Sequence, residues 1–226
     1  MKMPSVTGVQ RNFSKVPVAN IPRSTFKISH GYKTTFDEGY LVPVFLDAVI
    51  PGDTFNLKMT AFARLTTPIK PIMDNMSLES FFFFVPYRLL WENFVKMMGE
   101  KEKPADSISY TIPQQTVPAA GYNTGCLEDY FGFPVGVASS AAPWTHSALP
   151  RRAYAFVFNE WFRDQNLQDS KNENTAVGTH SIDDGPDNAY TGGTPLKRIN
   201  KRHDYFTSAL PWQQKGSAVD VPPGRS

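Results

Sequence analysis

Four consecutive phenylalanines, Phe81 to Phe84, constrain the fold of this chain more than any other feature. They lie in "SLESFFFFVPYRLLW", residues 77–91. In an extended strand, successive side chains point to opposite faces. The two faces then hold Leu78, Phe82 and Phe84 on one side and Phe81, Phe83, Val85 and Tyr87 on the other. A lone antiparallel sheet buries only one face, so a second element or a second subunit must cover the other.

Composition indicates a folded, loop-rich protein. Aromatic residues make up 13% of the 226 residues, charged residues 19%, and there are 19 prolines; this profile is not that of a disordered chain. The longest uncharged apolar run, residues 81–87, is far shorter than the roughly 20 residues that span a bilayer, so we expect no membrane insertion. The single cysteine, Cys126, excludes an internal disulfide, fits a reducing compartment and is expected to be a small buried side chain.

Three strands are predicted between residues 40 and 85. "YLVPVFLDAVI", residues 40–50, is apolar on both faces, and Pro43 places it at a sheet edge or a bulge. The sequence Pro51-Gly52-Asp53 is a turn signature. Residues 54–64 then alternate apolar and polar side chains, which predicts a strand with one solvent-exposed face. Residues 77–85 are predicted to form the third strand. The fold class predicted is mainly β with helical insertions.

Three short helices are predicted after these strands. The first follows Pro86 and ends at Gly99, the second lies between a Thr124 cap and Gly132, and the third opens at Pro150. The apolar faces of the first and third are Tyr87, Leu90, Trp91, Phe94, Met97 and Met98, and Tyr154, Val157, Phe158, Trp161 and Phe162. Residues 165–195 are polar and read as a long surface loop.

The first 36 residues form a basic arm. They carry six basic residues and no acidic one, whereas the rest of the chain holds 17 basic and 21 acidic residues, a net charge of −4. Three prolines and the absence of a helical period predict an extended arm. Such an arm is suited to an anionic partner, although a solvated leader or a contact with a neighbouring subunit is an open alternative. Its candidate nucleic-acid contacts are Lys2, Arg11, Lys15, Arg23 and Lys27.

A second basic cluster lies near the end of the sequence. Lys197, Arg198, Lys201 and Arg202 precede Tyr205 and Phe206, a combination that can bind phosphates and stack bases. Docking of these cations on acidic groups of the same protein is the open alternative.

The sequence predicts no catalytic chemistry, cofactor or metal site. Phosphate-loop, dinucleotide, zinc-protease, serine-hydrolase and paired-cysteine motifs are absent, and the four histidines are widely separated. "DDGPDN", residues 183–188, offers oxygen ligands but lacks the later glutamate of a calcium loop, so an exposed turn is preferred. We therefore expect a protein that is not an enzyme.

Several long segments resemble the major capsid protein of the microviruses, small single-stranded DNA bacteriophages, and the gokushovirus branch in particular. They are "RSTFKISHGYKTTFDEGYLVPV", the proline-glycine-aspartate turn, "ARLTTP", "FFVPYRLLW" and "DYFTSALPW" at 204–212. The resemblance runs in the same order over nearly the whole chain. It implies an eight-stranded viral jelly roll with long inter-strand loops, of which only part is in this chain.

The resemblance also implies a role and partners. The expected organisation is a basic arm (1–36), jelly-roll strands with a following helix (37–100) and a long insertion (101–226). Copies would assemble into an icosahedral shell around single-stranded DNA, with other viral structural or scaffolding proteins and a host cell-surface receptor as further partners. The protein would reside in the virion after assembly in the host bacterial cytoplasm. Residues expected in the barrel core or at subunit contacts are Phe81, Phe82, Phe83, Phe84, Tyr87, Trp91 and Phe94.

Two other functions share some of these features. A non-viral β-sandwich binding module of the lectin type would have the same turns and strands, but it leaves the acid-free arm unexplained. A jelly-roll enzyme of the cupin type requires histidines clustered on facing strands, and those of this chain are dispersed.

Overall fold

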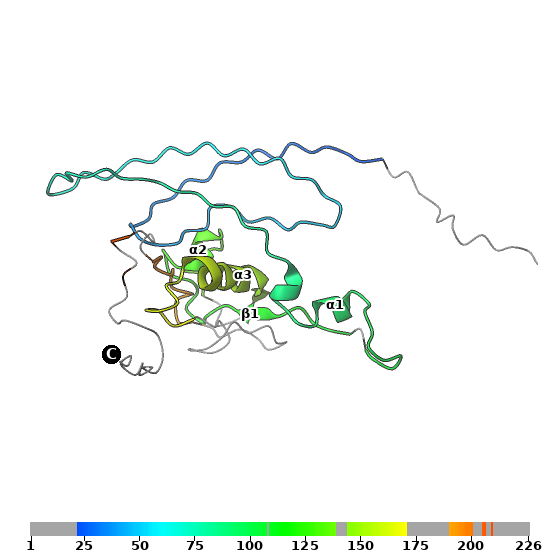
Figure 1. The fold of residues 1–226 in the computed structure, drawn as a ribbon. Coiled ribbons are helices and arrows are strands. Elements are labelled where there is room, and N and C mark those ends of the chain that lie inside the picture. The colour runs from blue at the N-terminus through cyan, green and yellow to red at the C-terminus, as the bar shows by residue number, and fades with distance from the viewer. Residues whose placement is uncertain are drawn as a thin grey trace, which may run out of the picture. The chain divides into compact units, whose positions relative to one another are not determined.

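The computed structural model describes residues 22–107, 109–138, 144–170, 190–200, 205–206 and 209. The chain divides into two units, residues 1–33 and residues 34–226. In the first unit, residues 22–33 are exposed and form neither a helix nor a strand. The elements of the second unit are η1 (Tyr87–Leu89), α1 (Phe94–Met97), β1 (Gln114–Thr116), α2 (Leu127–Tyr130), β2 (Thr145–Ser147), α3 (Leu149–Val157) and η2 (Phe158–Phe162) (Figure 1).

The strands β1 and β2 pair in an antiparallel sheet in which Gln115 lies opposite His146. Two further backbone bonds extend this pairing, because the Val117 N–H donates to the Trp144 carbonyl and the Ala148 N–H donates to the Pro113 carbonyl. The described chain is thus low in helix and carries a small antiparallel sheet, which is consistent with a mainly-β protein.

The hydrophobic core lies in two clusters outside the predicted strands. One is built on Leu90, Trp91 and Leu149, with Val85, Tyr87, Phe94, Met97, Tyr110, Ala153 and Phe156 packed around it. The other is built on Val117, Tyr122 and Cys126, with Phe133 and Trp144 beside it. The prediction that Cys126 is a small buried side chain is confirmed.

The three predicted strands are extended but are not paired into a ladder. Figure 1 draws residues 41–86 without an arrow, and the one bridge at their start joins Tyr40 to Arg198. The predicted turn does form, with Gly52 at φ +91° and the Asp53 N–H donating to the Ile50 carbonyl at 3.1 Å. A β-ladder requires a neighbouring strand, and the described residues place none beside 42–50, 54–64 or 77–85. The local pattern therefore gives extended backbone without a sheet.

The helix predicted after Pro86 is split into η1 and α1. In a continuous α-helix the Leu90 carbonyl would accept the Phe94 N–H. Instead it accepts Nη1 of Arg152 at 3.1 Å, and the Phe94 N–H bonds to the Trp91 carbonyl. The break turns Leu90 and Trp91 into the core, where both are buried. Gly99, at φ +104°, ends the second piece as predicted.

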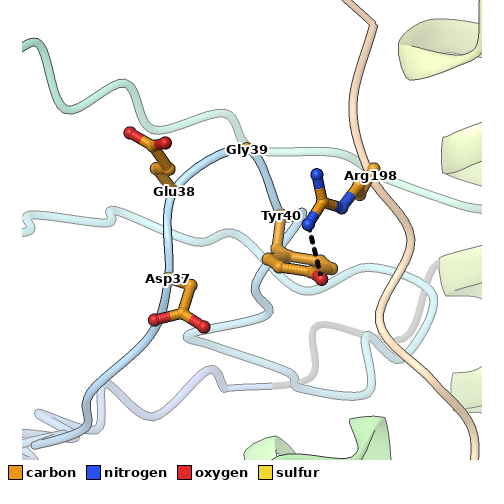
Figure 2. Close-up of a pocket in the computed structure, with 5 residues that line it drawn as sticks. All are labelled: Asp37, Glu38, Gly39, Tyr40 and Arg198. Carbon is orange, nitrogen blue, oxygen red and sulfur yellow. Dashed lines mark hydrogen bonds between the residues drawn. The ribbon is translucent and has the colours of Figure 1, made fainter.

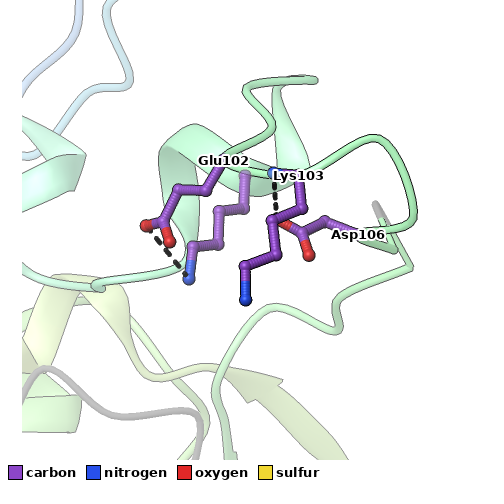
Figure 3. Close-up of polar contacts among 4 residues, drawn as sticks. Glu102, Lys103 and Asp106 are labelled. Carbon is purple, nitrogen blue, oxygen red and sulfur yellow. Dashed lines mark hydrogen bonds and ion pairs between the residues drawn. The ribbon is translucent and has the colours of Figure 1, made fainter.

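A hydrogen-bonded turn follows α1 (Figure 3). The ammonium of Lys96 pairs with the Glu102 carboxylate at 3.9 Å, and the Lys103 N–H donates to Oδ2 of Asp106 at 2.9 Å. Both contacts are local and lie at least partly in solvent, so they shape the surface of this turn and contribute little to stability.

The second predicted helix begins later than expected. Its N-cap is Cys126, so the prediction of a Thr124 cap is wrong. The carboxylate of Asp129 accepts the Gly125 N–H at 2.8 Å instead, which supplies an acceptor at the same helix end. The predicted stop at Gly132 is confirmed, with φ at +90°.

The third predicted helix is α3, which continues into the π-helix η2. Pro150 lies in its first turn, as predicted. Tyr154, Phe158 and Phe162 are buried on one face, but Trp161 is 63% exposed, so its placement on the buried face is wrong. A π-turn holds more residues than an α-turn, which rotates Trp161 away from the stripe that an α-helical period predicts.

Candidate functional site

The aromatic segment, residues 77–87, contacts the helix pair α3 and η2 through one of its two faces. The rings of Phe81 and Phe162 meet edge to face with centroids 5.4 Å apart, and Phe83 meets Phe162 at 5.8 Å and Trp161 at 6.1 Å. Phe81 and Phe83 stack on each other at 6.4 Å. The odd-numbered phenylalanines thus contact the segment predicted as an insertion, although Phe81 and Phe83 remain 48% and 44% exposed.

The opposite face of the aromatic segment is exposed in this chain. Phe82 is 56% exposed and Phe84 is 75% exposed, and Leu78 is also exposed. The other aromatic candidates are less exposed. Trp91 is fully buried. Tyr87 and Phe94 are half-buried, and their rings pack against each other with centroids 5.3 Å apart.

A wider apolar surface continues along the extended segments on either side of the Pro51 turn. Exposed apolar patches of this kind mark interaction surfaces. Its exposed members between residues 44 and 78 are Val44, Phe45, Leu46, Val49, Ile50, Phe55, Leu57, Met59, Phe62, Leu65, Ile69, Ile72, Met73, Met76 and Leu78.

A buried polar junction joins β1, α2 and the segment 190–200. We define it as Gln115, Tyr122, Glu128, His146 and Thr194. The Glu128 carboxylate, only 1% exposed, accepts three bonds: from the Thr194 hydroxyl at 2.6 Å, the Thr194 N–H at 2.7 Å and the Gln115 amide at 3.0 Å. Burial by itself raises the pKa of Glu128, but the bonds from Thr194 and Gln115 outweigh it, so the pKa is lowered. The carboxylate is thus held ionised inside the fold.

The junction continues through Tyr122 to His146. The Tyr122 hydroxyl lies 2.7 Å from Nε2 of His146 and 3.4 Å from the Gln115 amide nitrogen. The imidazole stacks on Phe133 with centroids 4.3 Å apart. Burial lowers the pKa of His146, so the ring is neutral near pH 7, and burial together with the Glu128 charge raises the pKa of Tyr122.

Cys126 lies beside the junction as an inert thiol. Burial raises its pKa to about 11, which leaves almost no nucleophilic thiolate at neutral pH. A Cβ added to Gly193 would lie 2.6 Å from the Cys126 sulfur, so glycine is required at this close approach. Gly193 also has φ at +103°, in the left-handed region.

The second predicted basic cluster is divided between buried and exposed positions. Lys197 is buried, with its backbone N–H donating to the Tyr154 hydroxyl at 2.9 Å. The guanidinium of Arg198 lies 4.8 Å from the centre of the Tyr40 ring and donates to its hydroxyl at 3.1 Å. Figure 2 shows Arg198 on one side of an open pocket and the carboxylates of Asp37 and Glu38 on the other, with Tyr40 between them. Arg198 therefore contacts an aromatic ring of its own fold. Docking of the cluster on acidic groups stays a prediction.

Several of the predicted site residues lie outside the part of the chain that the structure describes. In the arm, Arg23 and Lys27 are exposed, whereas Lys2, Arg11 and Lys15 lie outside the described residues. Lys201, Arg202 and the turn at 183–188 also lie outside them. Of the long loop predicted at 165–195, residues 165–167 are exposed, but Thr194 is fully buried, so the loop ends earlier than predicted.

The described residues offer neither a metal cluster nor a membrane-spanning helix. No group of three or more histidine, cysteine, aspartate or glutamate side chains among them is arranged to hold a metal ion. No helix in the described part of the chain is long and apolar enough to cross a membrane.

Comparison with known proteins decides the family. The profile of the "Capsid protein (F protein)" family matches residues 14–226. This chain is a member of that capsid protein family. The resemblance to gokushovirus-like microviruses is confirmed by the relatives, all called "Capsid protein VP1": one from Chlamydia phage 1 is 47% identical, one from Bdellovibrio phage phiMH2K is 44% identical and one from Spiroplasma virus 4 is 33% identical.

The capsid relatives are much longer than the chain. These matches cover 96–97% of the 226 residues but only 38–40% of each relative. The chain thus spans about two fifths of the length of the capsid proteins that it matches.

The polar junction of this capsid family member is the feature that sequence reasoning missed. Thr194 and Glu128 are separated by 66 positions, and Gln115 by a further 13. None of these residues lies in a recognisable motif. The only local signal was a glutamate in the first turn of a short amphipathic helix, and such a residue is ordinarily exposed.

Proposed function

We propose that the chain is part of a structural major capsid protein, copies of which self-assemble into an icosahedral shell around a single-stranded DNA genome. The observation that carries this proposal is the capsid family match over residues 14–226. The apolar surface on residues 44–84 supports it, because a shell protein needs extensive contacts with other protein. A lectin-like module is not favoured, and a non-enzymatic role follows from the same family.

We further propose the jelly-roll organisation for the whole protein. Residues 37–100 would supply strands of the barrel, residues 101–226 a long insertion, and residues 1–36 the arm. The exposed face of Phe82 and Phe84 would line the barrel core, while the Phe81 and Phe83 face packs on η2. Burying each aromatic side chain removes about 150–250 Å² from water, so this face contributes strongly to such a core.

The basic arm is proposed to contact the genome. Lys2, Arg11, Lys15, Arg23 and Lys27 would bind backbone phosphates without sequence preference. The contacts proposed for Arg198, Lys201 and Arg202 are secondary, because the Arg198 guanidinium already lies on Tyr40. Binding to single strands should weaken with salt at a log–log slope of about −0.7 per phosphate neutralised.

A salt series with intact and arm-deleted full-length protein tests this assignment. Deletion of residues 1–33 should reduce both the affinity for single-stranded DNA and the slope of the salt dependence. Unchanged affinity and slope would assign the arm to contacts with a neighbouring subunit.

Electron microscopy of the expressed full-length protein tests the capsid function. Closed shells of uniform diameter are the expected result, with the 226-residue chain as the control that forms none. Discrete small oligomers under a range of salt and protein concentrations would overturn the proposal. Scaffolding proteins, a host receptor and assembly in the bacterial cytoplasm belong to the same proposal and would be sought by purifying the complexes that form in infected cells.

A further inference from the structure

The hydrogen bonds around His146 have one self-consistent set of directions. Its Nδ1 lies 3.0 Å from the Ser147 carbonyl oxygen, which can only accept, so Nδ1 carries the proton. In the neutral ring Nε2 is then an acceptor, and the Tyr122 hydroxyl donates to it. The Tyr122 oxygen remains available to accept the amide N–H of Gln115.

The Gln115 side chain links this arrangement to Glu128. Its amide nitrogen is positioned to donate to both Tyr122 and the Glu128 carboxylate. Its Oε1 is buried without a hydrogen-bond partner in the part of the chain that the structure describes. A buried acceptor without a partner is uncommon in folded proteins, so its orientation requires a reason. The reason is that turning the amide would place Oε1 against the ionised carboxylate.

We propose that His146 is a pH switch that controls, through Tyr122 and Gln115, how firmly Glu128 holds the segment 190–200. When the imidazole gains a proton, Nε2 becomes a donor and faces the Tyr122 oxygen. The tyrosine proton must then find another acceptor. Among the described residues, Oε1 of Gln115 is a buried side-chain acceptor without a partner, and presenting it to Tyr122 requires the amide to turn.

Turning the Gln115 amide weakens the two hydrogen bonds that Thr194 donates to Glu128. The Glu128 carboxylate loses one of its three donors and gains a facing oxygen, which repels it. To avoid this oxygen the carboxylate must move, and both of its bonds to Thr194 depend on its position. The backbone bond from the Leu127 N–H to the Thr194 carbonyl remains, at 2.8 Å. The expected result is local opening of 190–200 without unfolding of α3.

The charged groups around His146 come from three elements. Glu128 on α2 attracts a protonated imidazole, Arg151 on α3 repels it, and Tyr122 faces it from the loop after β1. Burial against Phe133 has the largest effect and lowers the pKa of His146 below its ordinary value of 6.5. Because the folded-state pKa is lowered, the stabilisation is present above pH 6.5 and is lost as the pH falls through the folded value.

Hydrogen–deuterium exchange of the full 226-residue chain between pH 7.5 and pH 5 tests the switch, after correction for intrinsic exchange rates. The Thr194 amide is the reporter because it donates to Glu128. In the wild-type chain, opening of peptides within 190–200 should rise by up to about tenfold per pH unit as the pH falls from 6.5 to the lowered folded-state pKa and then level off, while α3 peptides stay protected. His146→Gln keeps an acceptor for Tyr122 but cannot gain a proton, so it should remove this rise. His30→Gln, at an exposed position of the first unit, is the matched control and should behave as wild type.

Three outcomes would overturn the proposal. The first is equal protection of 190–200 at pH 7.5 and pH 5 in the wild-type chain. The second is opening of α3 at the same pH as 190–200, which indicates global unfolding. The third is an unchanged pH profile in His146→Gln. If that variant does not fold, Tyr122→Phe replaces it, since removal of the hydroxyl cuts the connection and must likewise abolish the rise.

Discussion

Replacing Glu128 by glutamine should destabilise the fold strongly although it changes only one polar atom. The carboxylate accepts three bonds at 2.6–3.0 Å and is almost fully buried. A glutamine oxygen can still accept from Gln115 and the Thr194 hydroxyl. Its amide nitrogen would then face the Thr194 N–H, which sets donor against donor. One hydrogen bond to a charged group is worth about 1.5–3 kcal/mol, and leaving a buried donor unsatisfied adds to this loss.

We therefore expect Glu128→Gln to lower the free energy of unfolding by about 3 kcal/mol, roughly a hundredfold in the folded-to-unfolded ratio. Denaturant titration followed by tryptophan fluorescence measures this change, since Trp144 lies beside Tyr122 and His146. The matched control is Glu160→Gln, which makes the same chemical change at an exposed position. The control should shift the free energy by less than about 0.5 kcal/mol.

The pH dependence provides a second check on the same variant. Because the folded-state pKa of Glu128 is lowered from 4.5, its stabilisation is present above pH 4.5 and disappears as the pH falls through the folded value. Wild-type stability should fall in this range more steeply than that of Glu128→Gln. The reasoning is refuted if Glu128→Gln is as stable as Glu160→Gln, or if Glu128→Gln loses stability in acid as steeply as the wild type does.

Three further predictions follow from the packing. Gly193→Ala should destabilise by several kcal/mol more than Gly125→Ala in thermal melts, because both positions have positive φ but only Gly193 has the Cys126 side chain within 3 Å of the added carbon. Equal melting temperatures would contradict this. Phe82→Asp in the full-length protein should abolish soluble capsid, since a charge on this face would be buried without a partner; soluble shells from this variant would remove that face from the core. Limited proteolysis should cut the 226-residue chain within 54–84 but leave that segment intact in assembled full-length protein, and equal cleavage in both would count against the barrel.

Features set by one or two neighbouring residues were predictable from the sequence. The turn at Pro51 to Asp53, the helix ends at Gly99 and Gly132 and the first turn at Pro150 all form where expected. Each depends on the backbone geometry of glycine or proline, which is the same in any fold. The Thr124 cap was wrong because an aspartate within the helix supplied a competing acceptor.

Features set by contacts between distant residues were not predictable. The helix after Pro86 is broken by Arg152, 62 positions away, and the buried Glu128 is held by Thr194, 66 positions away. Sequence periodicity reports which side chains share a face and gives no information on what covers that face. In the aromatic segment, for example, periodicity places Phe81 and Phe83 on one face, but it does not identify Phe162 and Trp161 of η2 as the rings that they contact.

Residues 54–64 alternate apolar and polar side chains, whereas residues 77–85 are apolar on both faces, and both patterns are typical of strands. Both segments are extended and keep large apolar side chains exposed, while the described residues offer them no strand partner. Exposed backbone N–H groups and apolar side chains on the same segments are unfavourable in an isolated chain and are relieved together by a neighbouring strand. The sequence pattern orients the side chains of both segments, and the proposed barrel would supply the neighbouring strands that the described residues do not.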